Sequence, residues 1–143
     1  MGDMKNNRRT KKSVFPPLLR LSYVLQQSAE EILEEETGVG LSAARIMSVL
    51  DKSAAVSQRM VALQLRQTEA NVSRQLQVMK KSGLVSITRN KKDSRQRDVT
   101  LTVKGAHKYQ DALKILKKQQ RQFMRILNAG ETAAIETAAQ KFS

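Results

Sequence analysis

The sequence predicts a mainly α-helical fold with a small β-hairpin, in the α+β class. Apolar residues recur every three or four positions over most of the chain but partly alternate over residues 84–87 and 99–103, which is typical of strands. Aromatic residues make up only 3% of the chain and there is no Trp, so the core must be largely aliphatic, which suits helices. The length of 143 residues is sufficient for one domain with its own core.

The middle of the chain has the most regular order of predicted elements. A helix is expected over residues 57–65, then a turn at residues 66–67 and a second helix over residues 69–82. Thr68 is a suitable N-cap for the second helix because its hydroxyl can accept a backbone N–H of the first turn. Gly83 is a usual left-handed stop. The turn lacks the glycine that often joins two such helices.

The second of these helices has an apolar and a polar face. Val72, Leu76 and Met79 recur at four- and three-residue spacing and are expected to face the core. A helix that enters a major groove needs small and hydrogen-bonding residues on its exposed side, because Arg can bind guanine and Asn or Gln can bind adenine. The predicted DNA contacts of this helix are Thr68, Asn71, Ser73, Arg74 and Gln77.

The two predicted strands enclose a polar loop, residues 89–97, with five basic residues and one acid, Asp93. One interpretation is a solvated hairpin tip. The other is a wing whose basic side chains contact phosphates, with one Arg in the minor groove, while Asp93 pairs with a nearby Arg and holds the shape of the loop. The predicted wing contacts are Lys91, Lys92, Arg95 and Arg97. Helix, turn, helix, strand, wing and strand form a winged helix-turn-helix, a unit that reads duplex DNA.

The charge distribution supports a polyanionic partner. The formal net charge is +13, and residues 66–97 contribute nine basic and two acidic residues, or +7. Such clustering is the electrostatic footprint of nucleic-acid binding, whereas a face that serves only solubility would mix signs.

The rest of the chain is expected to complete a single domain, residues 14–143, after a basic disordered arm at residues 1–13. The arm either has no role or adds phosphate contacts. A short helix is expected over residues 42–53, with residues 54–56 as a candidate additional strand.

Long helical patterns flank the winged helix-turn-helix. The pattern after residue 104 repeats 3-4-3-4 with one polar interruption, Gln120, which is a heptad seam. A narrow seam on so long a helix favours packing against a second copy of the chain, although packing within one chain is the alternative. We therefore predict dimerisation helices at about 16–37, 104–127 and 131–142 around a winged helix at about 41–103, with Leu18, Leu25, Leu113, Leu116, Phe123, Ile135 and Phe142 in the interface.

Three short motifs resemble the MarR-type regulator family. Gly83-Leu84-Val85, Asp93-Ser94-Arg95 and the stretch from Val99 to Gly105 look like its G-L-V, D-x-R and V-x-L-T-x-x-G signature. The resemblance covers most of the chain, although Ser94 stands where the family commonly has a second Arg. It implies a homodimer that represses nearby genes until a small, often phenolic or anionic, effector binds between the dimer layer and the winged helix. The scarcity of aromatic residues suggests no obvious pocket for a planar ligand.

Several classes of function are not expected. The chain has no Cys, and its one His, His107, is expected at a surface or interface. A cluster of Glu residues near residue 34 has no His beside it and is interpreted as a solvated helix end. We see no apolar run of the roughly 20 residues that a membrane span needs, no secretory signal and no catalytic motif. We therefore expect a cytoplasmic protein that is not an enzyme, with no metal and no cofactor.

The favoured hypothesis is a homodimeric, sequence-specific regulator of transcription, expected to be a repressor, that binds double-stranded DNA at a pseudo-palindromic operator. An alternative is a sequence-tolerant or architectural nucleic-acid-binding protein, in which charge alone provides the affinity. A helical scaffold for a protein partner is a third hypothesis, and the basic wing argues against it.

Overall fold

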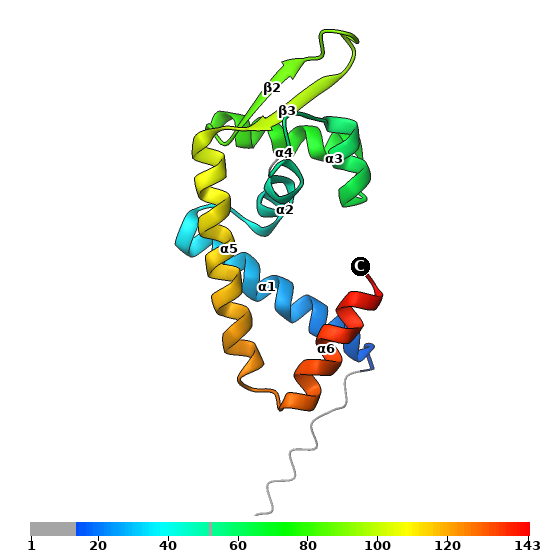
Figure 1. The fold of residues 1–143 in the computed structure, drawn as a ribbon, viewed down its shortest axis with the longest axis vertical. Helices are drawn as coiled ribbons and strands as arrows, with labels where there is room; N and C mark the ends of the chain where they lie inside the picture. The colour runs from blue at the N-terminus through cyan, green and yellow to red at the C-terminus, as the bar shows by residue number, and fades with distance from the viewer. Residues whose placement is uncertain (1–13, 52) are drawn as a thin grey trace, which may run out of the picture.

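The computed structural model describes residues 14–51 and 53–143, which form six helices and a small antiparallel sheet. The basic arm predicted at residues 1–13 lies outside this part of the chain. In Figure 1 the hairpin, α3 and α4 lie at one end, and α5 runs from the hairpin to the other end, where the chain reverses into α6. The elements are α1 Pro17–Thr37, α2 Leu41–Leu50, β1 Val56–Ser57, α3 Gln58–Leu65, α4 Glu69–Lys81, β2 Val85–Arg89, β3 Arg97–Leu101, α5 Val103–Met124 and α6 Ala129–Lys141.

The core lies at the winged-helix end of the molecule. Aliphatic side chains from α2, α3, α4 and β3 are fully enclosed, and α5 adds Tyr109 and Ala112 from its first half. The predicted inner face of α4 is confirmed, because Val72, Leu76 and Met79 are all buried. Removal of this apolar surface from water is the main force that holds the helices against the sheet.

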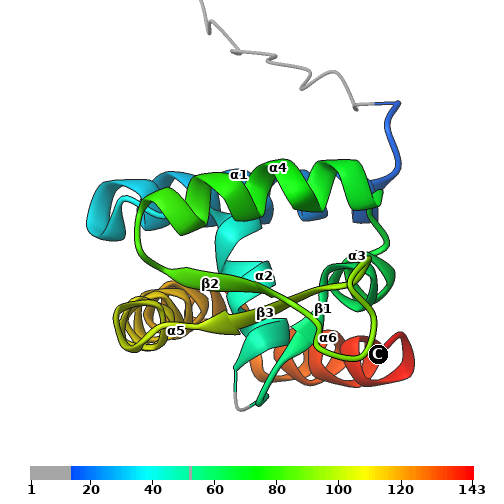
Figure 2. The same cartoon turned by 90° about the horizontal axis from the view of Figure 1, so that it is seen from above.

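The sheet has the strand order β1-β3-β2, with both pairings antiparallel. Val99 in the central strand lies opposite Val56 on one side and Ile87 on the other, and its side chain is fully buried. Seen from above in Figure 2, α4 runs alongside the hairpin. The additional strand expected at residues 54–56 is therefore present, but it consists of Val56 and Ser57.

A carboxylate on α1 fixes the connection between α1 and α2. Gly38 ends α1 in the left-handed conformation, with φ 68°, as is usual after a helix. Gly40 then precedes α2 without a side chain that could cap it. The Glu30 carboxylate accepts the backbone N–H of Leu41 instead, which satisfies one of the free N–H groups at the start of α2.

A second set of contacts joins α5 to the hairpin. The Thr102 hydroxyl accepts the N–H of Gly105 at 3.0 Å and donates to the carbonyl of Gly83 at 2.6 Å. A side chain at position 105 would collide with the carbonyl of Leu84. Glycine is required here because α5 passes so close to the backbone that leads into β2.

The predicted end of the second helix and the predicted end of the second hairpin strand were wrong by a few residues. Val103 was assigned to the second strand, but it begins α5, because the side chain of Thr102 caps the helix directly before it. The short helix expected to reach residue 53 ends at Leu50, where Asp51 takes an extended conformation.

The last connection was also misplaced. The long helix expected to reach residue 127 ends at Met124, and the final helix begins at Ala129, two residues earlier than predicted. Asn128 and Glu131 form a reciprocal capping box at its start, a strong signal for a helix N-terminus. Gly130 therefore lies inside the first turn of α6 and does not interrupt a helix.

Candidate nucleic-acid interface

The α4 helix begins and ends as its sequence indicates. The Thr68 hydroxyl accepts the N–H of Asn71 at 3.2 Å, and Glu69 lies in the first turn. Lys80 and Lys81 lie in the last turn, where positive charge is favourable to the helix dipole. After Ser82, Gly83 has φ 74°. The helix is thus held rigidly between a cap and the start of the hairpin.

The predicted base-contacting residues on α4 differ in how exposed their side chains are to solvent. Arg74 and Gln77 are exposed, whereas Asn71 and Ser73 are half-buried. The Asn71 amide donates to the side-chain oxygen of Gln67 at 3.0 Å, so that this side chain also stabilises the turn. Arg74 and Gln77 are therefore the two side chains most available for a partner.

The turn between α3 and α4 contains no glycine, and a residue with a side chain takes the left-handed conformation there. Arg66 itself takes the left-handed conformation, with φ 52°, which costs a non-glycine residue about 1–2 kcal/mol. The side-chain oxygen of the next residue, Gln67, accepts from Asn71 and from Gln75 at 2.8 Å. Sequence reasoning missed Gln67, and its only signal was a polar residue directly after a helix end.

Side-chain to backbone hydrogen bonds give the wing its shape. The Asn90 side-chain oxygen accepts the N–H groups of Lys92 and Asp93 at 2.8 and 3.0 Å. The Asp93 carboxylate accepts the N–H of Arg95 at 3.0 Å. The ion pair expected between Asp93 and a wing Arg is not found within the described residues; Asp93 binds the backbone instead. Asn90 was missed, although Asn at the start of a loop is a usual turn residue.

The basic residues of the wing point outwards or lie along its edge. Lys91, Lys92 and Arg95 are exposed, and Arg97 is half-buried with a 3.3 Å hydrogen bond to the carbonyl of Ser94. Arg97 lies opposite Arg89 in the hairpin, and like charges in such a pair repel each other. A bound anion would remove this repulsion.

A further carboxylate that the sequence did not single out lies at the base of the wing. Asp98 accepts the side-chain amides of Asn90 at 2.8 Å and Gln96 at 2.9 Å. Nearby, Arg59 on α3 and Glu69 on α4 form an exposed ion pair at 4.0 Å, which contributes little stability but directs the Glu69 carboxylate toward α3.

The residues predicted for the dimer interface differ in how far their own chain covers them. Leu113 and Leu116 pack against the core of their own chain. Leu25, Phe123 and Ile135, together with Leu116, line an apolar cavity of 610 Å³ between α1, α5 and α6. Leu18 and Phe142, at the outer ends of α1 and α6, are exposed. The dimer interface stays a prediction, and the side chains that the core of their own chain does not enclose are Leu18, Leu25, Phe123, Ile135 and Phe142.

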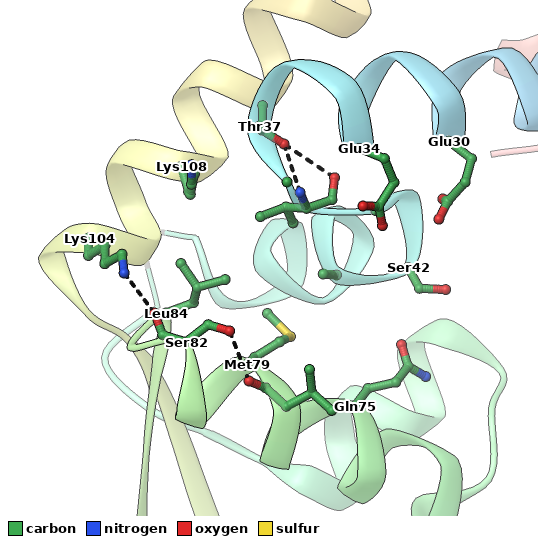
Figure 3. A pocket seen from close by; sticks show the side chains of 15 residues that line it. Glu30, Glu34, Thr37, Ser42, Gln75, Met79, Ser82, Leu84, Lys104 and Lys108 are labelled. Atoms are coloured by element: carbon green, nitrogen blue, oxygen red, sulfur yellow. Dashed lines mark hydrogen bonds between the residues drawn. The ribbon is translucent and has the colours of Figure 1, made fainter.

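A cavity of 370 Å³ lies between the α1–α2 connection, the inner side of α4 and the start of α5. Figure 3 shows Glu30 and Glu34 on one wall, and Lys104 and Lys108 on another. The side-chain oxygen of Gln75 is buried there without a hydrogen-bond partner. No aromatic side chain is among the described residues that line the cavity, which agrees with the expectation that the chain has no obvious pocket for a planar ligand.

Other expected features can be located within residues 14–51 and 53–143. His107 is exposed. No group of His, Asp and Glu in this part of the chain could hold a metal ion, and none of its helices combines the length and apolar character that crossing a membrane requires.

Residues 37–96, from the end of α1 to the wing, match the sequence model of the MarR family. No curated protein sequence matches the chain. Among solved structures, a mutant E. coli MarR complexed with operator DNA aligns with a TM-score of 0.73 and 21% identity over 88% of this chain and 93% of that one. The S. aureus MepR–DNA complex aligns with a TM-score of 0.74 and 19% identity, over 90% and 96%.

A third structure extends the comparison to a ligand complex. PcaV of Streptomyces coelicolor with its natural ligand aligns with a TM-score of 0.70 and 18% identity, over 85% of this chain and 88% of that one. At these identities the structures establish the shared fold, terminal helices included, while the sequence match establishes the kinship of the winged helix. Residues 37–96 of the chain are similar in sequence to the MarR family, and the chain shares its winged-helix fold with the solved MarR and MepR structures.

Proposed function

We propose that the chain is a homodimeric, sequence-specific repressor of transcription that binds double-stranded DNA. One observation carries the proposal: α4 and the wing lie at the same end of the molecule (Figure 1), and both carry exposed polar and basic side chains. Arg74, Gln77 and Lys91 are exposed there. An exposed helix fits a major groove, while a basic hairpin beside it reaches phosphates. Two proteins with this fold have been solved with DNA.

The terminal helices support the homodimer. Their apolar side chains border a 610 Å³ cavity that one chain leaves open, and a second copy would cover it. A symmetric dimer places two α4 helices on one side of the duplex. Its half-sites should then lie about 34–36 Å apart, which is one helical turn, in a pseudo-palindromic operator.

We further propose that a small molecule relieves repression by occupying the 370 Å³ cavity shown in Figure 3. Gln75 and Met79 of α4 line it together with Lys108 of α5, so an occupant would contact both the recognition helix and the helix that leads to the dimer layer. The unpartnered oxygen of Gln75 offers an acceptor to a ligand N–H or O–H. Binding that shifts α4 against α5 would change the distance between the two reading helices.

Selection of bound duplexes from a random pool tests the proposal. It should return a two-fold symmetric site. At that site Arg74→Ala should cost on the order of 1–3 kcal/mol and relax one base preference, whereas Arg95→Ala should weaken binding evenly across sequences. If both variants bind every sequence as well as the parent does, the roles assigned to α4 and the wing are wrong.

The net charge of +13 favours one alternative, a sequence-tolerant architectural protein. A competition assay separates the two. A specific regulator should prefer its site over random duplex by roughly a thousandfold or more, whereas an architectural protein should show a small ratio at every salt concentration.

A further inference from the structure

The second half of α5 carries a row of basic residues that the DNA-reading end of the molecule does not use. We call it the α5 stripe; all its members are exposed. The stretch from residue 112 to residue 125 contains no acid. The spacing of three and four residues places the basic side chains on one face of the helix. The α5 stripe consists of Lys114, Lys117, Lys118 and Arg121 of α5 and of Arg125, the residue directly after the helix.

The stripe faces away from the protein's own core and lies far from the wing. Leu113, Leu116 and Phe123 occupy the opposite side of α5, toward α1 and the apolar cavity. The helix has 22 residues and is about 33 Å long at 1.5 Å per residue. Because it starts at the hairpin, its second half lies at the end of the molecule remote from the wing (Figure 1).

Ion pairs among the described residues do not account for the stripe. The single ion pair among the described residues joins Arg59 to Glu69, on α3 and α4. The helix dipole favours cations only in the last turn, so it explains Arg121 and Arg125 but not Lys114 or Lys117. Like charges at three- and four-residue spacing repel each other, and five such pairs occur in the stripe.

The acids nearest to the stripe leave it with a surplus of positive charge. Asp111 precedes Lys114 by three residues on α5, and Lys118 shares a small cavity with Glu36 of α1. On the side of α6, a hollow of 690 Å³ is lined by Lys117, Arg121 and Arg125 and by a single acid, Glu136. The hollow is therefore a concave basic surface that is open to an external anion.

We propose that the α5 stripe binds the phosphate backbone of a second nucleic-acid duplex, so that a dimer seated on its operator can hold another DNA segment. From Lys114 to Arg125 the stripe extends for about 16 Å along the helix, a length that matches roughly five phosphates of one strand. Side chains on an outer helix face can reach phosphates but not base edges, so the contact is independent of sequence.

A two-duplex capture assay with the full chain tests this. A duplex with the selected operator is immobilised and saturated with protein, and a labelled duplex of unrelated sequence is added over a range of salt concentrations. Lys117→Gln with Arg121→Gln removes two charges from the stripe. Arg45→Gln with Lys141→Gln removes two charges from exposed positions on α2 and α6 and is the matched control.

The stripe variant should capture less of the second duplex, with a salt slope smaller by roughly two per subunit, and should bind the immobilised operator as the parent does. The control should match the parent in both measurements. Equal loss of capture in both variants, or no capture of the second duplex by the parent, would overturn the proposal. It would also be overturned if the parent captured vesicles with anionic lipids and did not capture the second duplex.

Failure of the parent to bind the immobilised operator would contradict the proposed function instead. The stripe would then be tested by direct titration of a duplex against Lys91→Gln with Lys92→Gln, alone and combined with the stripe variant; only an additional loss in the combination would support it.

Discussion

The winged-helix end and the terminal-helix end differ in how completely one chain can bury its own apolar side chains. At the winged-helix end, Ile46, Leu76 and Val99 are fully enclosed. At the terminal-helix end, α6 has no buried residue, and Leu18 and Phe142 are 77% and 90% exposed. Extended apolar surface of this kind is typical of an interaction site. One end is complete within a single chain, and the other leaves apolar side chains exposed, as the proposed homodimer expects.

The sequence model of the family matched only part of the winged-helix end. The match covers residues 37–96, and it leaves out nearly all of α1 and the whole of β3, α5 and α6. A self-contained core constrains which side chains fit, because even one methylene is felt in a close-packed interior. An interface needs mainly apolar side chains at the right spacing, which many sequences can provide.

The largest effect is expected from charge placed in the terminal-helix end. Leu25→Glu with Ile135→Glu puts carboxylates beside the apolar cavity, where burial against a second copy would desolvate them. The variant should be a monomer by light scattering and should lose roughly 10²–10⁴-fold in operator affinity, because the two reading helices are no longer linked. The winged helix should keep its helical circular dichroism.

The control for this variant adds the same two charges at exposed polar positions, Gln110→Glu and Gln140→Glu. It should remain dimeric. A dimer that survives in the Leu25/Ile135 variant would show that the chains associate through another surface, and the contrast between the two ends would need a different explanation.

The next largest effect is expected from a glycine-to-alanine substitution in the first turn of α5, which we compare with the same substitution in the first turn of α6. Gly105→Ala places a methyl group against the carbonyl of Leu84 and should lower the free energy of unfolding by about 1–3 kcal/mol, the usual cost of overpacking. At Gly130 a Cβ would meet only the Asn128 side chain at 3.4 Å. Gly130→Ala should therefore raise stability by up to about 1 kcal/mol, because Ala favours helix over Gly.

Denaturant unfolding of both variants measures this contrast. Opposite signs would confirm that α5 is tightly joined to the hairpin while the first turn of α6 is free. If Gly105→Ala is as well tolerated as Gly130→Ala, α5 can move away from the hairpin, and the two ends of the molecule are less firmly connected than the Thr102 hydrogen bonds indicate.

The features that could be predicted from the sequence are those with a local signal. The fold class, the α4 helix and its cap at Thr68 were predictable, because they depend on local period and on side chains that bind neighbouring backbone. The ends of α2 and α5 were not, since nothing in the local sequence opposes another helical turn there. The Asn128–Glu131 capping box was present in the sequence and was overlooked.

The basic residues of the candidate site could be predicted from the sequence, but the hydrogen bonds between its side chains could not. Lys91, Lys92 and Arg95 are exposed in the wing as expected. The roles of Gln67, Gln75 and Asp98 depend on residues that approach only after folding, and a polar residue in a polar segment gives no signal of its partner. The cavity beside Glu30 and Lys104 likewise results from four elements meeting.

The smallest effect concerns Tyr109, which lies on α5 where the two ends of the molecule meet and is 9% exposed. Burial of the phenol, and next the negative charge of Asp51, raise the pKa of Tyr109 above its ordinary value of 10.0. The folded chain therefore holds this proton more tightly than the unfolded chain. This contribution to stability is fully present below pH 10.0 and is lost as the pH rises and the unfolded chain ionises first.

Tyr109→Phe should remove that dependence, so that the free energy of unfolding of the variant, relative to its own value at about pH 8, declines less steeply than that of the parent up to about pH 11. The lysine titrations are common to both proteins and cancel in the difference. Parallel curves would mean that the phenol meets water in the folded protein, and the first half of α5 would then belong to the incomplete end of the molecule and not to the winged-helix core.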